Sequence, residues 1–179
     1  QSLAGQTARD ADSADEAYQR FEARLLALSR AHDLLTKRHW GTSPLGSLIR
    51  EVVVPVFDCE ADRLIIDGPP IEVSSRVALN LTMTLNELAI NALKHGAMRV
   101  ETGSLAVIWG TQPHADGVLL SLDWRERGGP LVSETNRRGL GARLMERCIE
   151  RDLDGKFDLS FASEGVACRF SLVIGAELQ

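Results

Sequence analysis

Three side chains suited to phosphate chemistry recur about one helical turn apart in the stretch 84–97, TLNELAINALKHGA. The Glu87 carboxylate can orient or deprotonate a nucleophile, and the Asn91 amide oxygen is a hard ligand of the kind that Mg²⁺ prefers. Lys94 can neutralise phosphate. On a helix, steps of three and four residues place these side chains on one face. Taken alone, such a face is more often a solvated helix surface, so the prediction depends on the rest of the chain.

Two glycine-bearing segments later in the chain could approach a phosphate and a base. In 138–144, RGLGARL, Gly139 and Gly141 open a predicted helix, where backbone N–H groups can approach phosphate oxygens. In 124–130, WRERGGP, Glu126 ends a predicted strand, where a carboxylate could accept a hydrogen bond from an exocyclic amine such as that of adenine. Each motif alone is weak, because a tight loop or a solvated charge explains it equally well. Their order after the asparagine-bearing helix favours a nucleotide site.

The composition predicts one globular domain with a smaller added element. The chain has 179 residues, of which 44% are hydrophobic and 25% charged, and its net charge is −5. The chain has no excess of basic residues that would indicate a nucleic acid or an anionic membrane as partner. It also has no apolar run long enough to cross a bilayer. Cys59, Cys148 and Cys168 are widely spaced without a CxxC motif. We therefore expect a reducing, cytoplasmic setting without structural zinc or a disulfide framework.

An apolar repeat in the first forty residues predicts a helix, about 14–38, that packs against other helices. Its seam has 3-4 spacing and consists of Tyr18, Phe21, Leu25, Leu28, His32 and Leu35. The first nine residues cannot cover this seam alone, so we expect part of a helical hairpin, which could support a homodimer. The break at 40–44 separates this element, residues 1–40, from a second domain, residues 41–179.

The second domain is predicted to be α+β. Residues 45–57 are predicted to begin as a helix that ends at Pro55, and two further helices are predicted at 76–96 and 140–153. The predicted strands span 63–67, 71–73, 104–111, 118–125, 157–161 and 166–174. Ser74 and Ser75 cap the long helix. Its core-facing residues are expected to be Leu81, Leu85, Leu88, Ala89, Ala92 and Leu93. The sum is a mostly antiparallel sheet covered on one face by helices.

The order of the three motifs resembles the N box, G1 box and G2 box of the histidine-kinase-like ATPase (Bergerat) fold. Sensor histidine kinases, gyrase-type ATPases and serine-kinase anti-sigma factors share this fold. Trp124-Arg125-Glu126 matches the W-x-E signature of the HWE subfamily of bacterial sensor histidine kinases. Residues 87–97 resemble its N box, and residues 24–40 resemble the second helix of its dimerisation and histidine-phosphotransfer domain. The resemblance implies a two-layer α/β sandwich preceded by part of a helical hairpin.

The resemblance implies ATP and Mg²⁺ as cofactors and assigns roles by position. Asn91 would ligate the Mg²⁺ that bridges the ATP phosphates, Glu87 would be the base or orienting group for an attacking histidine, and Lys94 would contact phosphate. Glu126 would read adenine. The nucleotide pocket would be completed by residues of the two glycine motifs, namely Gly128, Arg138, Gly139, Leu140 and Gly141. Residues 131–138 would form the lid.

Two departures from the subfamily pattern shape the expected activity. Asn86 stands where we place the N-box histidine of the subfamily, and an asparagine cannot titrate near neutral pH. The phosphoacceptor motif, H-R-x-x-N, is not present, and residues 1–9 look like the segment that follows it. We expect a fragment that binds ATP without autophosphorylating. Its histidine target would lie upstream, and the phosphoryl group would pass to an aspartate in the receiver domain of a response regulator.

Two other functions compete with this prediction. A non-catalytic phosphotransfer or docking adaptor could keep the fold without binding ATP, and a serine kinase of the anti-sigma type could use the same fold. Intact Glu87, Asn91, Gly139 and Gly141 argue against the adaptor. The predicted helix 14–38 argues against the serine kinase, since that class needs no hairpin ahead of its ATPase domain.

Overall fold

The structure, a computed structural model of the chain, describes residues 42–57, 61–130, 140–162 and 165–175. The predicted helical hairpin, the whole predicted lid, and Cys59, Arg138 and Gly139 lie outside these residues. None of the described helices is long and apolar enough to pass through a membrane.

The framework of the domain is a five-stranded sheet with the strand order β2-β4-β5-β7-β6. Strands β2 and β4 pair in parallel, and all the other pairs are antiparallel. The five strands are β2 (Leu64–Asp67), β4 (Ser104–His114), β5 (Gly117–Arg127), β6 (Lys156–Ala162) and β7 (Gly165–Gly175). A separate two-stranded ladder joins β1 (Thr42–Pro44) to β3 (Glu72–Ser74).

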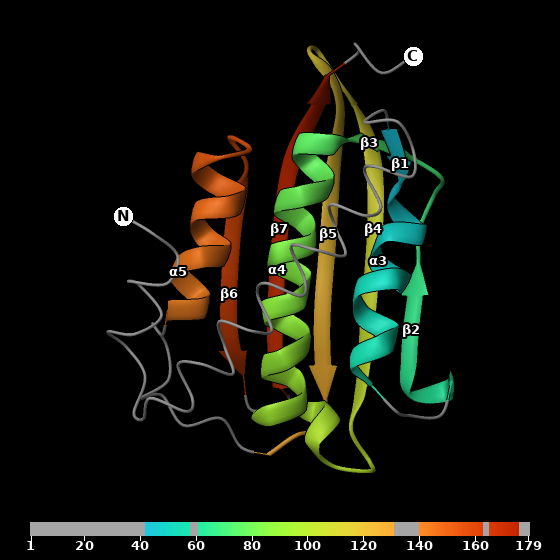
Figure 1. The fold of residues 1–179 in the computed structure, drawn as a ribbon, viewed down its shortest axis with the longest axis vertical. Coiled ribbons are helices and arrows are strands. Elements are labelled where there is room, and N and C mark those ends of the chain that lie inside the picture. The colour runs from blue at the N-terminus through green and yellow to red at the C-terminus, as the bar shows by residue number, and fades with distance from the viewer. Residues whose placement is uncertain (1–41, 58–60, 131–139, 163–164, 176–179) are drawn as a thin grey trace.

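Three helices lie side by side on one face of this sheet, with α4 in the middle (Figure 1). The helical segments are α3 (Leu45–Val53), which runs into a 3-10 turn at Val54–Val56, α4 (Ser75–Lys94), and α5 (Leu140–Glu146), which continues as a π-helix at Arg147–Arg151. Short 3-10 turns also occur at Ala61–Arg63 and Ala97–Arg99. The predicted two-layer sandwich, a mostly antiparallel sheet covered by helices on one face, is confirmed.

The sequence of α4 explains why it lies at the centre of the helical layer. Ser74 caps its first turn, accepting a hydrogen bond from the Val77 N–H at 3.4 Å. Its inner face is fully buried against inward-facing residues of the sheet, and comprises Leu81, Leu85, Leu88, Ala89 and Ala92. The inclusion of Leu93 in this face was wrong, because its side chain is 42% exposed. Leu93 is one residue, or about 100°, beyond Ala92, and this rotation turns it out of the core.

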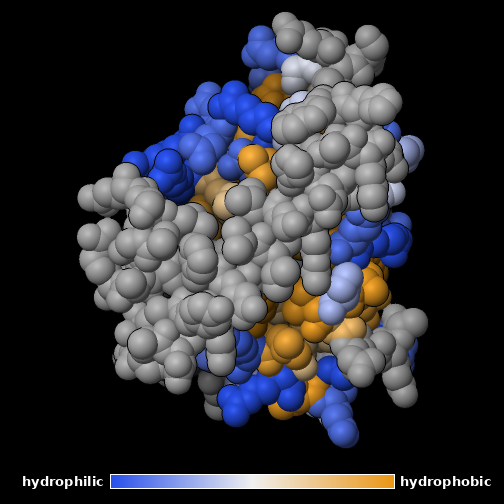
Figure 2. Space-filling model, in the orientation of Figure 1, coloured by the Kyte–Doolittle hydropathy of each residue, from blue (hydrophilic) through white to orange (hydrophobic). Residues whose placement is uncertain are grey.

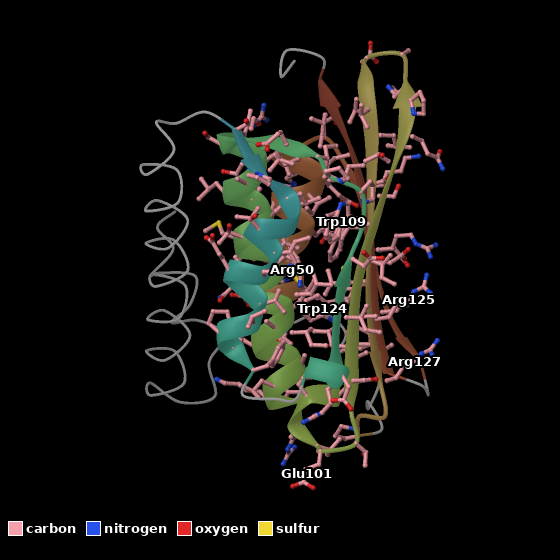
Figure 3. All side chains as sticks on the ribbon, turned by 90° about the vertical axis from the view of Figure 1, so that its right-hand side faces the viewer. Arg50, Glu101, Trp109, Trp124, Arg125 and Arg127 are labelled. Atoms are coloured by element: carbon pink, nitrogen blue, oxygen red, sulfur yellow. The ribbon has the colours of Figure 1, made fainter. Side chains whose placement is uncertain are left out.

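Alternation along β5 separates the core from solvent. Figure 3 shows Trp109 and Trp124 pointing into the space between helices and sheet, whereas Arg125 and Arg127 point to the other side. Trp124 is completely buried, and the two arginines are exposed. This period of two is the pattern expected for a sheet with one covered face.

Three local features differ from the predictions. Residues 42–44, interpreted as a break, form β1. Pro113, placed in a loop, lies within β4, where proline is tolerated because β2 pairs only with 105–108 and β4 is an edge strand beyond that point. The helix predicted at 140–153 changes from α to π after Glu146.

Candidate functional site

The polar side chains along one edge of α4 have different partners in the two halves of the helix. In the first half, they form hydrogen bonds within α4. Thr84 donates its hydroxyl hydrogen to the Asn80 carbonyl at 2.9 Å, and the Asn80 amide donates to the Arg76 carbonyl at 3.0 Å. Both side chains are buried, since α5 and its π-helical extension pack on this edge. These hydrogen bonds satisfy polar groups that burial would otherwise destabilise.

The second half of the same edge meets the start of α5. Glu87 is 9% exposed, while Asn91 and Lys94 are exposed near the end of the helix. A Cβ atom added to Gly141 would lie 2.9 Å from Glu87 Oε2 and 3.7 Å from Asn91 Nδ2. The backbone of the second predicted glycine motif therefore lies directly against the predicted carboxylate and amide.

The absence of a side chain at Gly141 is what permits this approach. Any larger residue would displace the Glu87 carboxylate, because a gap of 2.9 Å is closer than a Cβ and an oxygen normally come. A glycine at this position lets the backbone at the start of α5 approach the α4 side chains closely. Leu140 is the first residue of α5, and its side chain is not among those described.

A second contact holds the far end of α4 to β5 through Glu126. The Ala97 backbone N–H donates to Glu126 Oε2 at 2.8 Å, and the Trp124 indole N–H donates to Glu126 Oε1 at 3.1 Å. Glu126 is only 4% exposed, and its Oε2 contacts the position where Gly96 lacks a Cβ. The W-x-E motif thus forms a buried clamp on the residues that follow α4.

Burial sets the electrostatics of this clamp. Removal from water raises the pKa of the Glu126 carboxyl, because desolvation disfavours its charged form. The hydrogen bonds from Ala97 and Trp124 act in the opposite direction and favour the carboxylate, but less strongly. The Glu126 carboxyl is therefore a more weakly acidic group than a solvated glutamate.

This geometry gives Glu126 a structural task that sequence reasoning missed. Glu126, which was predicted to bind adenine, already accepts one hydrogen bond at each carboxylate oxygen, although such an oxygen can accept two. Trp124 and Glu126 are two residues apart on β5, so their side chains point to the same, inward side of the sheet. This alternation could have indicated a buried role for Glu126. Its partner, Ala97, is 29 residues away in sequence, and only the folded chain brings it near.

The glycines after Glu126 fit closely against the same end of α4. A Cβ added to Gly129 would lie 2.8 Å from both the N and Cα atoms of Ala97. Gly128 adopts a φ of +71°, in the left-handed region that favours glycine, and its added Cβ would lie 3.1 Å from the Thr102 carbonyl oxygen. The loop that leaves β5 is consequently held against residues 96–103.

Three segments far apart in the sequence therefore meet around the C-terminal end of α4. The helix end contacts Gly141 through Glu87 and Asn91, and it contacts the end of β5 through Gly96 and Ala97. Figure 1 shows the ends of α4 and β5 at the same end of the sandwich, with the start of α5 above that end, on the α4 side.

The donor set suits a metal ion that is shared with a ligand. Among the described residues, no group of three or more His, Cys, Asp and Glu side chains could hold a metal ion by itself. The exposed Asn91 side chain lies beside the Gly141 backbone, and its amide oxygen is of the ligand type that Mg²⁺ binds. This ion keeps several waters and is commonly held by one or two protein oxygens together with substrate phosphates.

The chain is similar in sequence to histidine kinases. The sequence model of the HWE histidine kinase family matches residues 1–70. The blue-light-activated histidine kinase of Brucella ovis is 34% identical over 166 residues, which are 93% of this chain and 34% of that protein. The chain thus spans about a third of the length of this curated relative.

Solved structures show the same fold. The histidine kinase domain of the Erythrobacter litoralis EL346 blue-light activated histidine kinase superposes with a TM-score of 0.66 at 16% identity, covering 86% of this chain and 74% of that one. The catalytic domain of histidine kinase ThkA gives a TM-score of 0.51 at 19% identity, covering 74% and 95%. The α+β domain therefore has the fold of histidine kinase catalytic domains. In sequence, the chain is similar to the HWE histidine kinase family over residues 1–70 and to a curated histidine kinase over most of its length.

Proposed function

We propose that the described domain binds Mg-ATP around the C-terminal end of α4 and acts as the catalytic domain of a protein histidine kinase. Residues 41–179 would form this domain, and residues 1–40 would belong to a dimerisation and histidine-phosphotransfer element. The observation that carries the proposal is the approach of Gly141 to Glu87 and Asn91. It joins the acid, the amide and the glycine motif at one place.

In this proposal the α4 side chains divide the work on the phosphates. Asn91 would hold Mg²⁺ through its amide oxygen, and Lys94 would neutralise a phosphate oxygen. Bound Mg-ATP would supply the γ-phosphoryl group. Glu87, with its Oε2 beside Gly141, would orient the incoming histidine or accept its proton. The contribution of the chain is thus positioning and charge neutralisation, as in other phosphoryl transfers.

The remaining site residues would hold the rest of the nucleotide. Glu126 would accept a hydrogen bond from the adenine amine with a lone pair left by Ala97 and Trp124, next to Gly128. Arg138, Gly139 and Leu140 would complete the phosphate side. The phosphoryl group would pass from a histidine outside this chain to an aspartate in the receiver domain of a response regulator. A cytoplasmic location would suit a kinase that uses ATP.

Two asparagines on the same edge of α4 provide a matched test. Asn91 is exposed beside Gly141, whereas Asn80 is buried and bonded to its own helix. A ligand that binds only the native state raises the melting temperature, and the stabilisation grows with the logarithm of its concentration over its Kd once the ligand is in excess. We expect Mg-ATP to stabilise the parent and the Asn80→Ala variant by the same increment. Asn91→Ala should keep the melting temperature of the parent without ligand and lose the increment.

Two results would contradict the proposal, and each contradicts a different part of it. An increment in Asn91→Ala equal to that of the parent contradicts the metal assignment. A parent that shows no increment at millimolar Mg-ATP contradicts nucleotide binding altogether and favours the adaptor function.

A further inference from the structure

The turn that leads from α4 into β4 is exposed, although it adjoins the buried clamp at Glu126. Glu101 and Thr102 at its tip are exposed, whereas Gly103 at its end is buried. The turn lies at the lower end of the molecule in Figure 1, and Figure 2 shows hydrophilic residues at that end, below the apolar residues over the ends of α3 and α4. Core packing does not hold an exposed turn, so its position depends on its hydrogen bonds.

Arg63 binds this turn from the side of the neighbouring strand. It is the last residue of the 3-10 turn Ala61–Arg63 and directly precedes β2. Its Nε donates to the Gly103 carbonyl at 2.8 Å, and its Nη2 donates to the Val100 carbonyl at 2.5 Å. The Gly103 N–H also donates to the Val100 carbonyl, at 3.2 Å, and closes the turn. One guanidinium thus joins both ends of the turn, as its rigid fork of donors permits.

The sheet fixes where the backbone of Arg63 lies. Strands β2 and β4 pair in parallel with Leu64 opposite Leu105, so both strands begin at the same end of the sheet. On its other side, Leu105 lies opposite Glu126 of β5. Arg63 and Glu126 therefore lie near the same end of the sheet with β4 between them, and the turn 100–103 leads directly into β4.

Close backbone contacts connect this turn to the Glu126 carboxylate. A Cβ added to Gly103 would lie 1.8 Å from the Ala97 carbonyl oxygen, and Ala97 is the residue whose N–H donates to Glu126 Oε2. A Cβ added to Gly128 would lie 3.1 Å from the Thr102 carbonyl oxygen. A displacement of the turn would therefore move the donor that orients Glu126 and would also disturb the loop that leaves β5.

We propose that Arg63 is a positioning residue for the adenine end of the nucleotide site. Its guanidinium holds the turn 100–103, and the turn holds Ala97 and the Glu126 carboxylate in the orientation that accepts a hydrogen bond from the adenine amine. Arg63 acts through the turn and not through the nucleotide. This inference rests on the proposed function, and it adds a residue that none of the three sequence motifs contains.

Binding of two nucleotides to the full chain tests this role. Purine riboside triphosphate differs from ATP only in lacking the exocyclic amine that Glu126 is proposed to bind. We expect the parent to bind Mg-ATP about tenfold more tightly than the magnesium complex of this analogue, the factor that one hydrogen bond to a charged group commonly contributes. Arg63→Met keeps the apolar stem and removes the donors, so it should bring the two affinities within about twofold. Arg63→Lys, which retains a charged donor, should show an intermediate preference.

Arg50→Met is the matched control for these variants. Arg50 Nη2 donates to the Ile66 carbonyl at 2.9 Å, so it makes the same kind of hydrogen bond to a backbone carbonyl, farther along β2. This variant should keep the nucleotide preference of the parent. A general loss of packing would weaken both nucleotides equally, so the ratio of the two affinities separates positioning from stability.

Amide exchange without nucleotide measures the link between Arg63 and the clamp separately. The Ala97 N–H donates to Glu126, and the Gly103 N–H donates to Val100. Both amides should exchange about tenfold faster in Arg63→Met than in the parent, because the turn opens more often. In Arg50→Met they should exchange at the rate of the parent.

The results that would overturn the inference are distinct from failure of the proposed function. If the parent prefers Mg-ATP and Arg63→Met keeps that preference, or if the two amides exchange equally in both proteins, the positioning role is wrong and nucleotide binding stands. Equal affinity of the parent for both nucleotides would show that the adenine amine is not bound, and the role falls with it. A parent that binds neither nucleotide overturns the proposed function together with this inference.

Discussion

In the first half of α4 the buried polar side chains of Asn80 and Thr84 bond back to their own helix, whereas polar side chains in the second half face other segments. Asn80 and Thr84 donate to carbonyls four residues earlier, and Arg76 donates to the Asp152 carbonyl at the end of the π-helix. Glu87 and Asn91 instead lie against the glycine backbone that opens α5.

The difference shows how one amphipathic pattern can serve two purposes. Asn80 and Thr84 in the first half form their hydrogen bonds within α4. They can therefore be buried under α5, and their contribution is to stability. The second half ends at two glycine segments whose backbones approach the helix without side chains between them. Substitutions in the first half should therefore change stability alone, and substitutions at the exposed end should change ligand binding.

The largest effect is expected from removing the clamp on the end of α4. Glu126→Ala leaves the buried Ala97 N–H and Trp124 indole N–H without an acceptor, and an unsatisfied buried donor costs about 1–3 kcal/mol. We expect the free energy of unfolding to fall by about 2–5 kcal/mol in urea titrations. Glu101→Ala is the control, since Glu101 points away from the molecule (Figure 3) and should change stability by less than about 0.5 kcal/mol. Equal losses in both variants would contradict the clamp.

A smaller loss should follow when a methyl group is placed in the tightest backbone contact. Gly129→Ala puts a Cβ 2.8 Å from the N and Cα atoms of Ala97, which cannot move aside as a flexible side chain can. Overpacking of this kind costs about 1–3 kcal/mol. Gly110→Ala on β4 is the matched control, because no atom lies within 4 Å of its added Cβ. Thermal and urea unfolding should separate the two variants; identical stabilities would mean that the β5 loop is not packed on α4.

In the first half of α4, Thr84→Val should cost about 1 kcal/mol, because it removes the hydrogen bond to the Asn80 carbonyl and conserves side-chain volume. The Mg-ATP increment in melting temperature should equal that of the parent. Loss of the increment in this variant would show that the first half of α4 also affects Mg-ATP binding, which would contradict the difference between the two halves.

The smallest effect concerns pH. Because burial raises the folded-state pKa of Glu126 above its ordinary value near 4.5, the native state binds this proton more tightly than the unfolded state. The contribution of Glu126 to stability is therefore full below pH 4.5 and is lost as pH rises through the raised pKa. Urea midpoints measured from pH 4.5 upward should decline more steeply in the parent than in Glu126→Gln. A steeper decline in Glu126→Gln would contradict the sign of the shift.

The sequence predicted the fold well where periodicity and caps were clear. The long amphipathic run with Ser74 before it predicted α4, and alternation predicted β4 and β5. The errors have local physical causes. Leu93 lies at the margin of the apolar stripe, and Pro113 is tolerated in a strand only because β4 lacks a neighbour there.

The candidate site was predicted in part. Helical spacing put Glu87 and Asn91 on one edge, but the contact of that edge with Gly141 came from resemblance to a family and could not come from spacing. Spacing also could not show that Asn80 and Thr84 bond inward, because a helical wheel does not distinguish them from Asn91. The hydrogen bond from Ala97 to Glu126 joins residues 29 apart, and only tertiary packing determines it.

The most direct test of the central claim, that three separated segments form one Mg-ATP site at the C-terminal end of α4, is hydrogen exchange of the full chain with and without saturating Mg-ATP. The account predicts added protection at 87–97, 126–129 and the start of α5, and none at the β4–β5 turn around Asp116. Protection at that turn alone, or no change anywhere at millimolar Mg-ATP, would contradict it.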